Sequence, residues 1–315
     1  MWPGSARRHE RSRCEARRND RQAVLDSGAS GRLQPTRVKH VTTESTIFQP
    51  DTRVLDKFIR WIERFDQRHA RAWAHRYKAD PEAATCESMF WGVLTDCRVS
   101  VEPNADPTGQ EKAPDFVCRK GDRKFYVEVT CIRTDTATEH SALPPIFTEG
   151  ARNYRPLNDA IFAEVTSKTP QCANLDAPCV LAVGTFHYHA SVSCIRKTFV
   201  EWLLTGETSI SWYFDPRRGE AVGKPFQSTS LKSAAFLKPS PLVGVEPARK
   251  PISALVVAGF GCRPPHVYGV LHPHPVREFE AELLDRIPFC RVKYDIRAAS
   301  ITTEWTQDPE PETAI

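Results

Sequence analysis

Apolar side chains recur at intervals of three and four residues from 51 to 78, as Phe58 and Ile62 illustrate. This periodicity predicts one amphipathic helix over the whole segment. A second helix is expected to begin at Asp80-Pro81, because Asp is a favourable N-cap and Pro suits the first helical turn. Helical spacing returns in three later segments: 157–168, 193–204 and 276–286.

Other segments show alternation of period two or short continuous apolar runs, both of which are typical of strands. The longest apolar runs, such as 253–260, are far shorter than the roughly 18 residues that suggest a membrane span. The expected strands are 98–101, 115–119, 124–132, 179–186, 210–214, 252–260, 267–271, 291–296 and 300–304. Helices and strands are interspersed, so we expect an α/β fold with a mixed central β-sheet flanked by helices.

Three segments lack either pattern. Residues 133–155 form an expected loop, and residues 215–250, rich in Pro, Ser, Gly and Lys, form an expected long flexible loop. The N-terminal residues are rich in Arg and are expected to be disordered. We therefore divide the chain into a basic tail (1–46), an α/β core (47–206) and a C-terminal extension (207–315), which either completes the sheet or binds a partner.

The charge of the chain is concentrated in the tail. The 315 residues carry a net charge of +4, and the first 37 contain nine Arg against four acidic residues. The remainder holds 34 basic and 35 acidic residues, so the folded part is close to neutral. If it binds nucleic acid, its Lys and Arg must gather on one face.

Targeting and cysteine patterns favour a cytoplasmic protein with no membrane association. The N-terminus lacks the apolar stretch of a signal peptide, and its acidic residues argue against a transit peptide. The ten cysteines include no C-x-x-C pair, and several fall within apolar strands. Without a secretion signal, we expect reduced thiols.

The tetrapeptide Lys120-Gly121-Asp122-Arg123 is a hairpin signal between two expected strands. If residue 120 pairs with residue 123, Asp115 faces Glu128, and Thr130 lies two residues further along the same face. The opposite face is then apolar and carries Phe116, Cys118, Phe125, Val127, Val129 and Cys131.

Two carboxylates facing each other are tolerated when solvent screens them or a cation lies between them. Mg²⁺ binds through one or two carboxylates and keeps several waters, so Asp115 and Glu128 are candidate metal ligands. Glu87 borders the buried stripe of the second helix, where a Glu needs a partner. If that helix packs on the sheet, Glu87 becomes a third ligand; otherwise it is a surface residue.

Pro114-Asp115, followed thirteen residues later by Glu128-Val129-Thr130 at the end of a hairpin, resembles the PD-(D/E)xK nuclease superfamily. The resemblance implies a restriction-endonuclease-like core ordered helix, three strands, helix, strand, which residues 81–186 match. It also implies that Asp115 and Glu128 hold the metal and that Glu87 is the helical acid. Lys168 and Gln171 at the end of the second core helix are similar to residues of uncharacterised bacterial proteins of this type.

One position departs from the family pattern, since Thr130 stands where the family usually has Lys. That Lys is thought to orient or activate the attacking water, and Thr has no useful pKa for the task. The superfamily can move this Lys to a neighbouring helix. Lys168 is the candidate, because it follows the stripe Leu157, Ile161 and Val165; a Lys at a helix C-terminus is also favoured by the helix dipole alone.

The resemblance implies metal-dependent hydrolysis of phosphodiester bonds in nucleic acid, with DNA the expected substrate and Mg²⁺ or Mn²⁺ the cofactor. Asp115, Glu128, Glu87, Lys168 and Thr130 are the candidate catalytic residues. The alternative is an inactive nuclease-fold module that binds nucleic acid or a protein. A third interpretation is an α/β protein whose acids simply point into solvent. Sequence preference and oligomeric state stay open.

Other motifs carry weaker hypotheses. His187 and His189, with Cys194, are conceivable zinc ligands, but no second ligand pair accompanies them. His272 and His274 are expected turn residues. The stretch 259–261, Gly-Phe-Gly, lacks the third glycine of a dinucleotide-binding fold, so we interpret it as a strand end.

Overall fold

The computed structural model describes residues 51–104, 113–141, 155–215, 217–242, 244–295 and 300–307. The chain divides into two units, 1–43 and 44–315, and the description below concerns the second. The basic tail expected over residues 1–46 lies outside the described residues. Within these ranges, no helix has the length and apolar character needed to cross a membrane.

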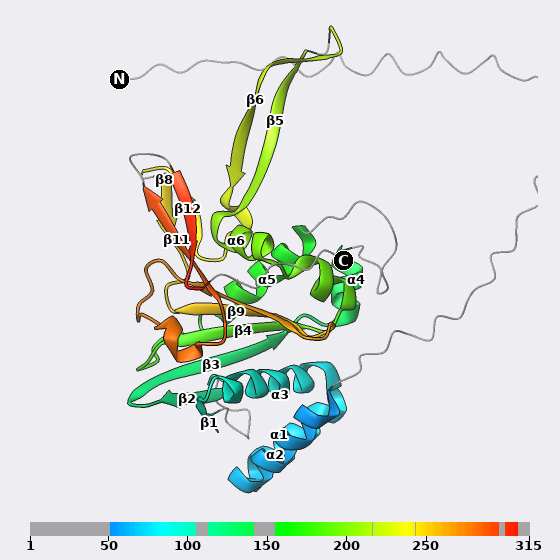
Figure 1. The fold of residues 1–315 in the computed structure, drawn as a ribbon, viewed down its shortest axis with the longest axis vertical. Coiled ribbons are helices and arrows are strands. Elements are labelled where there is room, and N and C mark those ends of the chain that lie inside the picture. Colours follow the sequence, from blue (N-terminus) through cyan, green and yellow to red (C-terminus); the bar gives the residue numbers. More distant parts are fainter. Residues whose placement is uncertain are drawn as a thin grey trace, which may run out of the picture. The chain divides into compact units, whose positions relative to one another are not determined.

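An eight-stranded mixed sheet runs through the second unit in the order β1-β2-β3-β4-β9-β10-β11-β12 (Figure 1). β1, β2 and β3 are antiparallel, β4 is parallel to both β3 and β9, and β10 is antiparallel to β9. β11 is parallel to β10 and antiparallel to β12. The strands are β1 Ser100–Pro103, β2 Phe116–Lys120, β3 Arg123–Cys131, β4 Cys179–Thr185, β9 Ala254–Gly259, β10 His266–Leu271, β11 Phe289–Asp295 and β12 Ser300–Trp305. The C-terminal residues therefore complete the sheet.

Helices cover both faces of this sheet (Figure 1). They are α1 Thr52–Phe65, α2 Gln67–Ala79, α3 Pro81–Asp96, α4 Thr134–Ser141, α5 Arg155–Lys168 and α6 Lys197–Thr205. One apolar cluster joins α1, α2 and α3 to residues such as Phe116 and Val127, and a second joins α5 and α6 to residues such as Leu181 and Val183. The predicted α/β class with a mixed sheet flanked by helices is confirmed.

The single helix predicted over residues 51–78 is wrong, because the chain breaks at Asp66 into α1 and α2. Asp66 has extended backbone angles (φ −156°, ψ 124°), and its carboxylate accepts a 2.8 Å hydrogen bond from the backbone N–H of Arg68. An Asp side chain that satisfies a free N–H begins a new helix where apolar periodicity alone predicts continuation.

Two other helix predictions need correction. The segment 276–286 contains only a 3₁₀ turn, Ala281–Leu284, without a side-chain N-cap, although its apolar residues from Phe279 to Leu284 are buried. Tertiary packing, rather than a regular helix, accounts for that apolar spacing. In the segment 193–204, α6 begins only at Lys197, after a π-helical turn, Ala190–Cys194.

The segments expected to be loops contain regular structure. Within 215–250, β6 (Glu220–Ser230) pairs with β5 (Glu207–Asp215), and β7 (Leu237–Ser240) pairs with β8 (Gly244–Pro247). Gly219 and Gly244 have φ values of 67° and 77°, which supply the tight turns that few other residues adopt. In the expected loop 133–155, α4 is the described part.

His272, in the bend after β10, gives a testable pH dependence of stability. The residue is 5% exposed, Nε2 donates to the Ala248 carbonyl (2.8 Å), and Nδ1 accepts from the His274 N–H (2.9 Å). Burial lowers the pKa of His272 to about 4 from 6.5. Between these values the unfolded chain binds the proton and the folded chain does not. The contribution of His272 to stability is therefore complete above pH 6.5 and falls by about 3 kcal/mol as the pH drops to 4.

The measurement is the free energy of unfolding by denaturant across pH 4–7 for the parent and for His272→Gln. We expect the variant to lose this slope, because Gln cannot bind the proton in the unfolded chain. His75→Gln on α2, where the ring is exposed, is the matched control and should keep the parent slope. An identical slope in parent and His272→Gln would show that His272 is protonated in the folded protein.

Candidate functional site

The hairpin β2–β3 has the register predicted from its Gly-Asp turn. Phe116 pairs with Val127 and Lys120 with Arg123, and Gly121 has a φ of 63° at the turn. The apolar face packs in the cluster with α3, as expected. Because side chains alternate along a strand, Glu128 points to the opposite face, toward α5.

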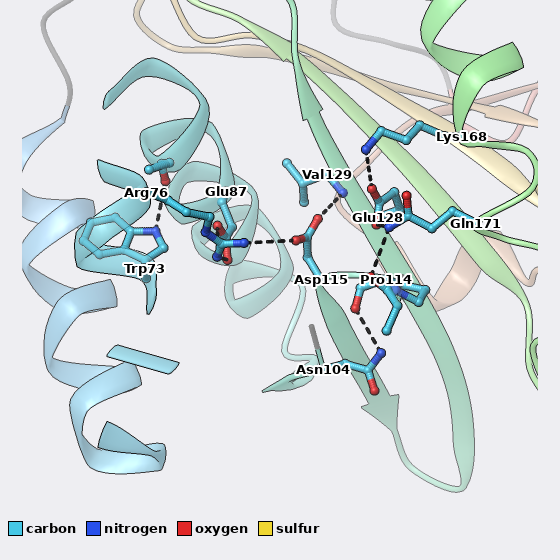
Figure 2. Close-up of polar contacts among 12 residues, drawn as sticks. Trp73, Arg76, Glu87, Asn104, Pro114, Asp115, Glu128, Val129, Lys168 and Gln171 are labelled. Atoms are coloured by element: carbon cyan, nitrogen blue, oxygen red, sulfur yellow. Dashed lines mark hydrogen bonds and ion pairs between the residues drawn. The ribbon is translucent and has the colours of Figure 1, made fainter. Parts of the chain in front are cut away.

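Glu128 is a buried carboxylate with hydrogen bonds to both oxygens. It is 2% exposed, Lys168 Nζ lies 2.8 Å from Oε1, and Gln171 Nε2 lies 2.8 Å from Oε2 (Figure 2). Gln171 also donates to the carbonyl of Ala113 at 3.0 Å. Donors at both oxygens match the ionised form of Glu128, which only accepts.

Lys168 lies at the end of the buried stripe of α5. Leu157, Ile161 and Val165 are buried in the cluster that includes β4, so the stripe lies on the sheet. The last turn of α5 consequently brings the Lys168 amine against Glu128. A catalytic role for this amine stays a prediction.

Asp115 lies immediately before β2, and its carboxylate reaches the next strand. Its Oδ2 accepts the backbone N–H of Val129 at 2.8 Å, while its own carbonyl accepts the backbone N–H of Asn104 at 2.8 Å. The Asp115 side chain is 15% exposed. Asp115 therefore contacts the β3 residue that directly follows Glu128.

Glu87 on α3 engages a residue that sequence reasoning missed. Arg76 Nη2 lies 3.0 and 2.9 Å from the two Glu87 oxygens, and Arg76 Nη1 lies 3.9 Å from Asp115 Oδ1 (Figure 2). The sequence signal was present, since a Glu bordering a buried stripe needs a partner. It did not indicate which of the many basic residues that partner is.

Thr130 supplies a neutral hydroxyl, and not a charged group, to the site. Its hydroxyl donates to Glu164 Oε2 at 2.9 Å. Glu164 is on α5, one turn before Lys168, so Thr130 contributes to the packing of the same helix. Neither Gln171 nor Glu164 was predicted as a site residue, although Gln171 formed part of the resemblance.

The electrostatics of the site are dominated by buried acids. Burial raises the pKa of Glu87, Asp115 and Glu128, and the charge of Asp115 raises the pKa of both glutamates further. Arg76 and Lys168 oppose these increases. Burial disfavours the ammonium of Lys168, but the Glu128 carboxylate more than compensates and raises the Lys168 pKa. The acids are therefore stable as anions only beside positive charge.

The donor set fits a hard divalent ion by its chemistry. Among the described residues no group of three or more His, Cys, Asp or Glu side chains is arranged to hold a metal. Arg76 and Lys168 form ion pairs with Glu87 and Glu128. Mg²⁺, however, needs only one or two carboxylates together with water. Asp115 and Glu128 supply such oxygens, and Glu87 is separated from them by Arg76.

The other sequence candidates do not add a site within the described ranges. His187 and His189 are buried, but among the described residues they belong to no group of three or more potential metal ligands, and the side chain of Cys194 lies outside the described residues. At the end of β9, a Cβ on Gly259 would lie 2.8 Å from the Cα of Ser191. This glycine therefore allows close packing, as expected for a strand end.

Comparison of the chain with protein-family models, curated proteins and solved structures gives no match.

Proposed function

We propose that the chain is a restriction-endonuclease-like nuclease that hydrolyses phosphodiester bonds of DNA with Mg²⁺ or Mn²⁺. The observation that carries the proposal is the contact of the Lys168 amine with Glu128 at 2.8 Å. It supplies, from α5, the basic side chain that Thr130 does not supply from β3. A solvated charged hairpin would not need a buried carboxylate held by both Lys168 and Gln171.

The order of elements supports the proposal. α3 is followed by the antiparallel strands β1, β2 and β3, then by α5 and by β4, which runs parallel to β3. This is the order helix, three strands, helix, strand that the sequence resemblance implied. The insertion of α4 before α5 leaves the order of the sheet unchanged.

Asp115 and Glu128 would hold the ion, which when bound supplies positive charge opposite the scissile phosphate. Gln171 keeps Glu128 in place through its second oxygen. An ammonium donates hydrogen bonds and accepts none, so Lys168 would orient the attacking water and stabilise charge developing on the phosphate.

A second candidate function is supported by a different observation. Arg76 and Lys168 already neutralise Glu87 and Glu128 without an ion. A site balanced in this way is also expected of a module that keeps the nuclease scaffold and binds nucleic acid or a protein without cutting.

Cleavage of supercoiled plasmid and of single-stranded DNA tests the proposal. We expect nicking with Mg²⁺ or Mn²⁺ and none with EDTA. Glu128→Gln, purified in parallel, controls for contaminating nucleases and should be inactive. Absence of cleavage with every ion, together with retained DNA binding, would reject the nuclease and favour the binding module.

A further inference from the structure

We propose that Arg76 holds the place of the divalent ion in the ion-free protein, and that ion binding turns its guanidinium outward to bind a phosphate of the nucleic acid. This inference rests on the proposed function, because it concerns the same acids. It assigns to Arg76 a role in coupling ion binding to substrate binding, which the resemblance did not include.

The Arg76 guanidinium lies between two acids of the site. Arg76 Nη2 contacts both oxygens of Glu87 at 3.0 and 2.9 Å, and Nη1 approaches Asp115 Oδ1 at 3.9 Å. Figure 2 shows the guanidinium between these two carboxylates, which come from different elements. A cation bridging acids of α3 and of the residue before β2 occupies the kind of position that a shared metal ion would take.

The backbone of Arg76 is fixed, whereas the charged end of its side chain is accessible. One helical turn earlier, Trp73 is 4% exposed, and its Nε1 donates to the Ala84 carbonyl at 3.3 Å, which anchors α2 to α3. The Arg76 side chain is 47% exposed, against 11% for Glu87 and 15% for Asp115. Side-chain rotation alone can therefore carry the guanidinium into solvent while the acids stay buried.

The net charge of the site favours either the ion or Arg76 beside the acids, and not both. In their ionised forms Glu87, Asp115 and Glu128 carry three negative charges, and Arg76 and Lys168 carry two positive charges. A divalent ion added to this set would leave an excess of positive charge in a buried site. With Arg76 turned outward, the ion and Lys168 balance the three acids. The ion and Arg76 therefore compete for Glu87 and Asp115.

A guanidinium released from Glu87 is suited to bind a phosphate. The planar guanidinium offers parallel N–H donors that match two phosphate oxygens, and it keeps its charge at any physiological pH. Released from Glu87, it stays at the rim of the site because α2 is anchored. A backbone phosphate of the DNA next to the scissile bond is the partner of this chemistry.

Binding of Mn²⁺ to the full-length protein without DNA, followed by the electron paramagnetic resonance signal of free Mn²⁺, tests the competition. We expect Arg76→Gln to bind Mn²⁺ about tenfold more tightly than the parent, because one charge-assisted pair no longer has to break. Arg71→Gln is the matched control: it removes the same charge from an exposed position of α2 and should leave Mn²⁺ affinity near the parent value.

Arg76→Lys provides a second variant, should Glu87 without a partner prevent folding of Arg76→Gln. A single ammonium cannot bridge both acids, so its Mn²⁺ affinity should lie between those of the parent and Arg76→Gln. Equal or weaker Mn²⁺ binding in both variants would overturn the inference and leave the proposed function intact. If Glu128→Gln does not weaken Mn²⁺ binding in the parent or in either Arg76 variant, the proposed function itself is overturned.

The outward position is tested with a fluorescent DNA duplex and saturating Ca²⁺, which replaces Mg²⁺ without supporting cleavage in the assay. Arg76→Gln should bind the duplex more weakly than Arg71→Gln, by about tenfold, although it binds the ion more tightly. Opposite changes in ion and DNA affinity are a result that simple loss of packing would not give. Equal DNA affinity of the two variants would remove the phosphate contact from the proposal.

Discussion

Replacing Lys168 with Ala should lower the rate of DNA cleavage by about 10²–10³-fold, the usual cost of removing one donor that stabilises charge in the transition state. The structure places the Lys168 amine 2.8 Å from Glu128 and within the electrostatic range of Asp115. Since Glu128 is buried, its charge also loses a partner, so we expect a loss of about 1–3 kcal/mol of stability. Cleavage must be measured well below the melting temperature, under single-turnover conditions.

Lys124→Ala is the matched control for Lys168→Ala. Lys124 also forms an ion pair with an acid, Asp176, at 2.9 Å, but at the surface and away from Glu128. Its removal should change neither rate nor stability by more than a small factor. Equal cleavage by Lys168→Ala and the parent would show that Lys168 has not taken over the family's missing Lys.

A second substitution sharpens the Lys168 experiment. Thr130 follows Glu128 on the same face of β3 and contacts Glu164 of α5. Thr130→Lys in the Lys168→Ala background should restore part of the activity, because it rebuilds the usual arrangement of the family. If neither the parent nor Thr130→Lys cleaves DNA, the binding module becomes the better explanation.

Replacing Glu128 with Gln should abolish cleavage and weaken ion binding by at least about 100-fold, since losing even outer partners of a metal ligand costs about 10–100-fold. The amide keeps the shape of the side chain, but its NH₂ group faces a donor, either Lys168 or Gln171. Isothermal titration with Mn²⁺ measures the ion affinity, and plasmid nicking measures the activity.

Glu102→Gln is the corresponding control. Glu102 on β1 pairs with Arg119 at 3.1 Å, and both side chains are about half exposed, 44% and 46%. This substitution should change neither ion binding nor cleavage. Retention of metal-dependent cleavage by Glu128→Gln would show that Glu128 does not hold the catalytic ion.

Local patterns were sufficient to predict the framework of the site. A Gly-Asp turn fixes the pairing of β2 with β3, and alternation then places Glu128 opposite the apolar face. The stripe ending in Val165 likewise fixes which side of α5 meets the sheet, and hence where Lys168 points. Turn chemistry and side-chain period act over a few residues, so the sequence alone can specify them.

The remaining features depend on contacts between segments that no local pattern encodes. Arg76 meets Glu87 only because α2 and α3 cross where Trp73 contacts Ala84. The break at Asp66 reflects a capping hydrogen bond that outweighs an uninterrupted apolar stripe. The strands within 215–250 depend on their partners in β5 and β8, whereas Pro and Gly content alone favours a loop.

Three side chains from α5 and the turn that follows it contact β3. These contacts restrict the number of residues between the three positions. Glu164 reaches Thr130, whereas Lys168 and Gln171 reach Glu128, so the three side chains follow one line at intervals of four and three residues. Inserting one residue after Glu164 would rotate the following side chains by about 100° around the helix axis. Both Lys168 and Gln171 would then leave Glu128, although every residue type is retained. Between positions 164 and 171 the spacing of the chain is therefore as restrictive as its composition, and insertions or deletions there should be far less tolerated than conservative substitutions.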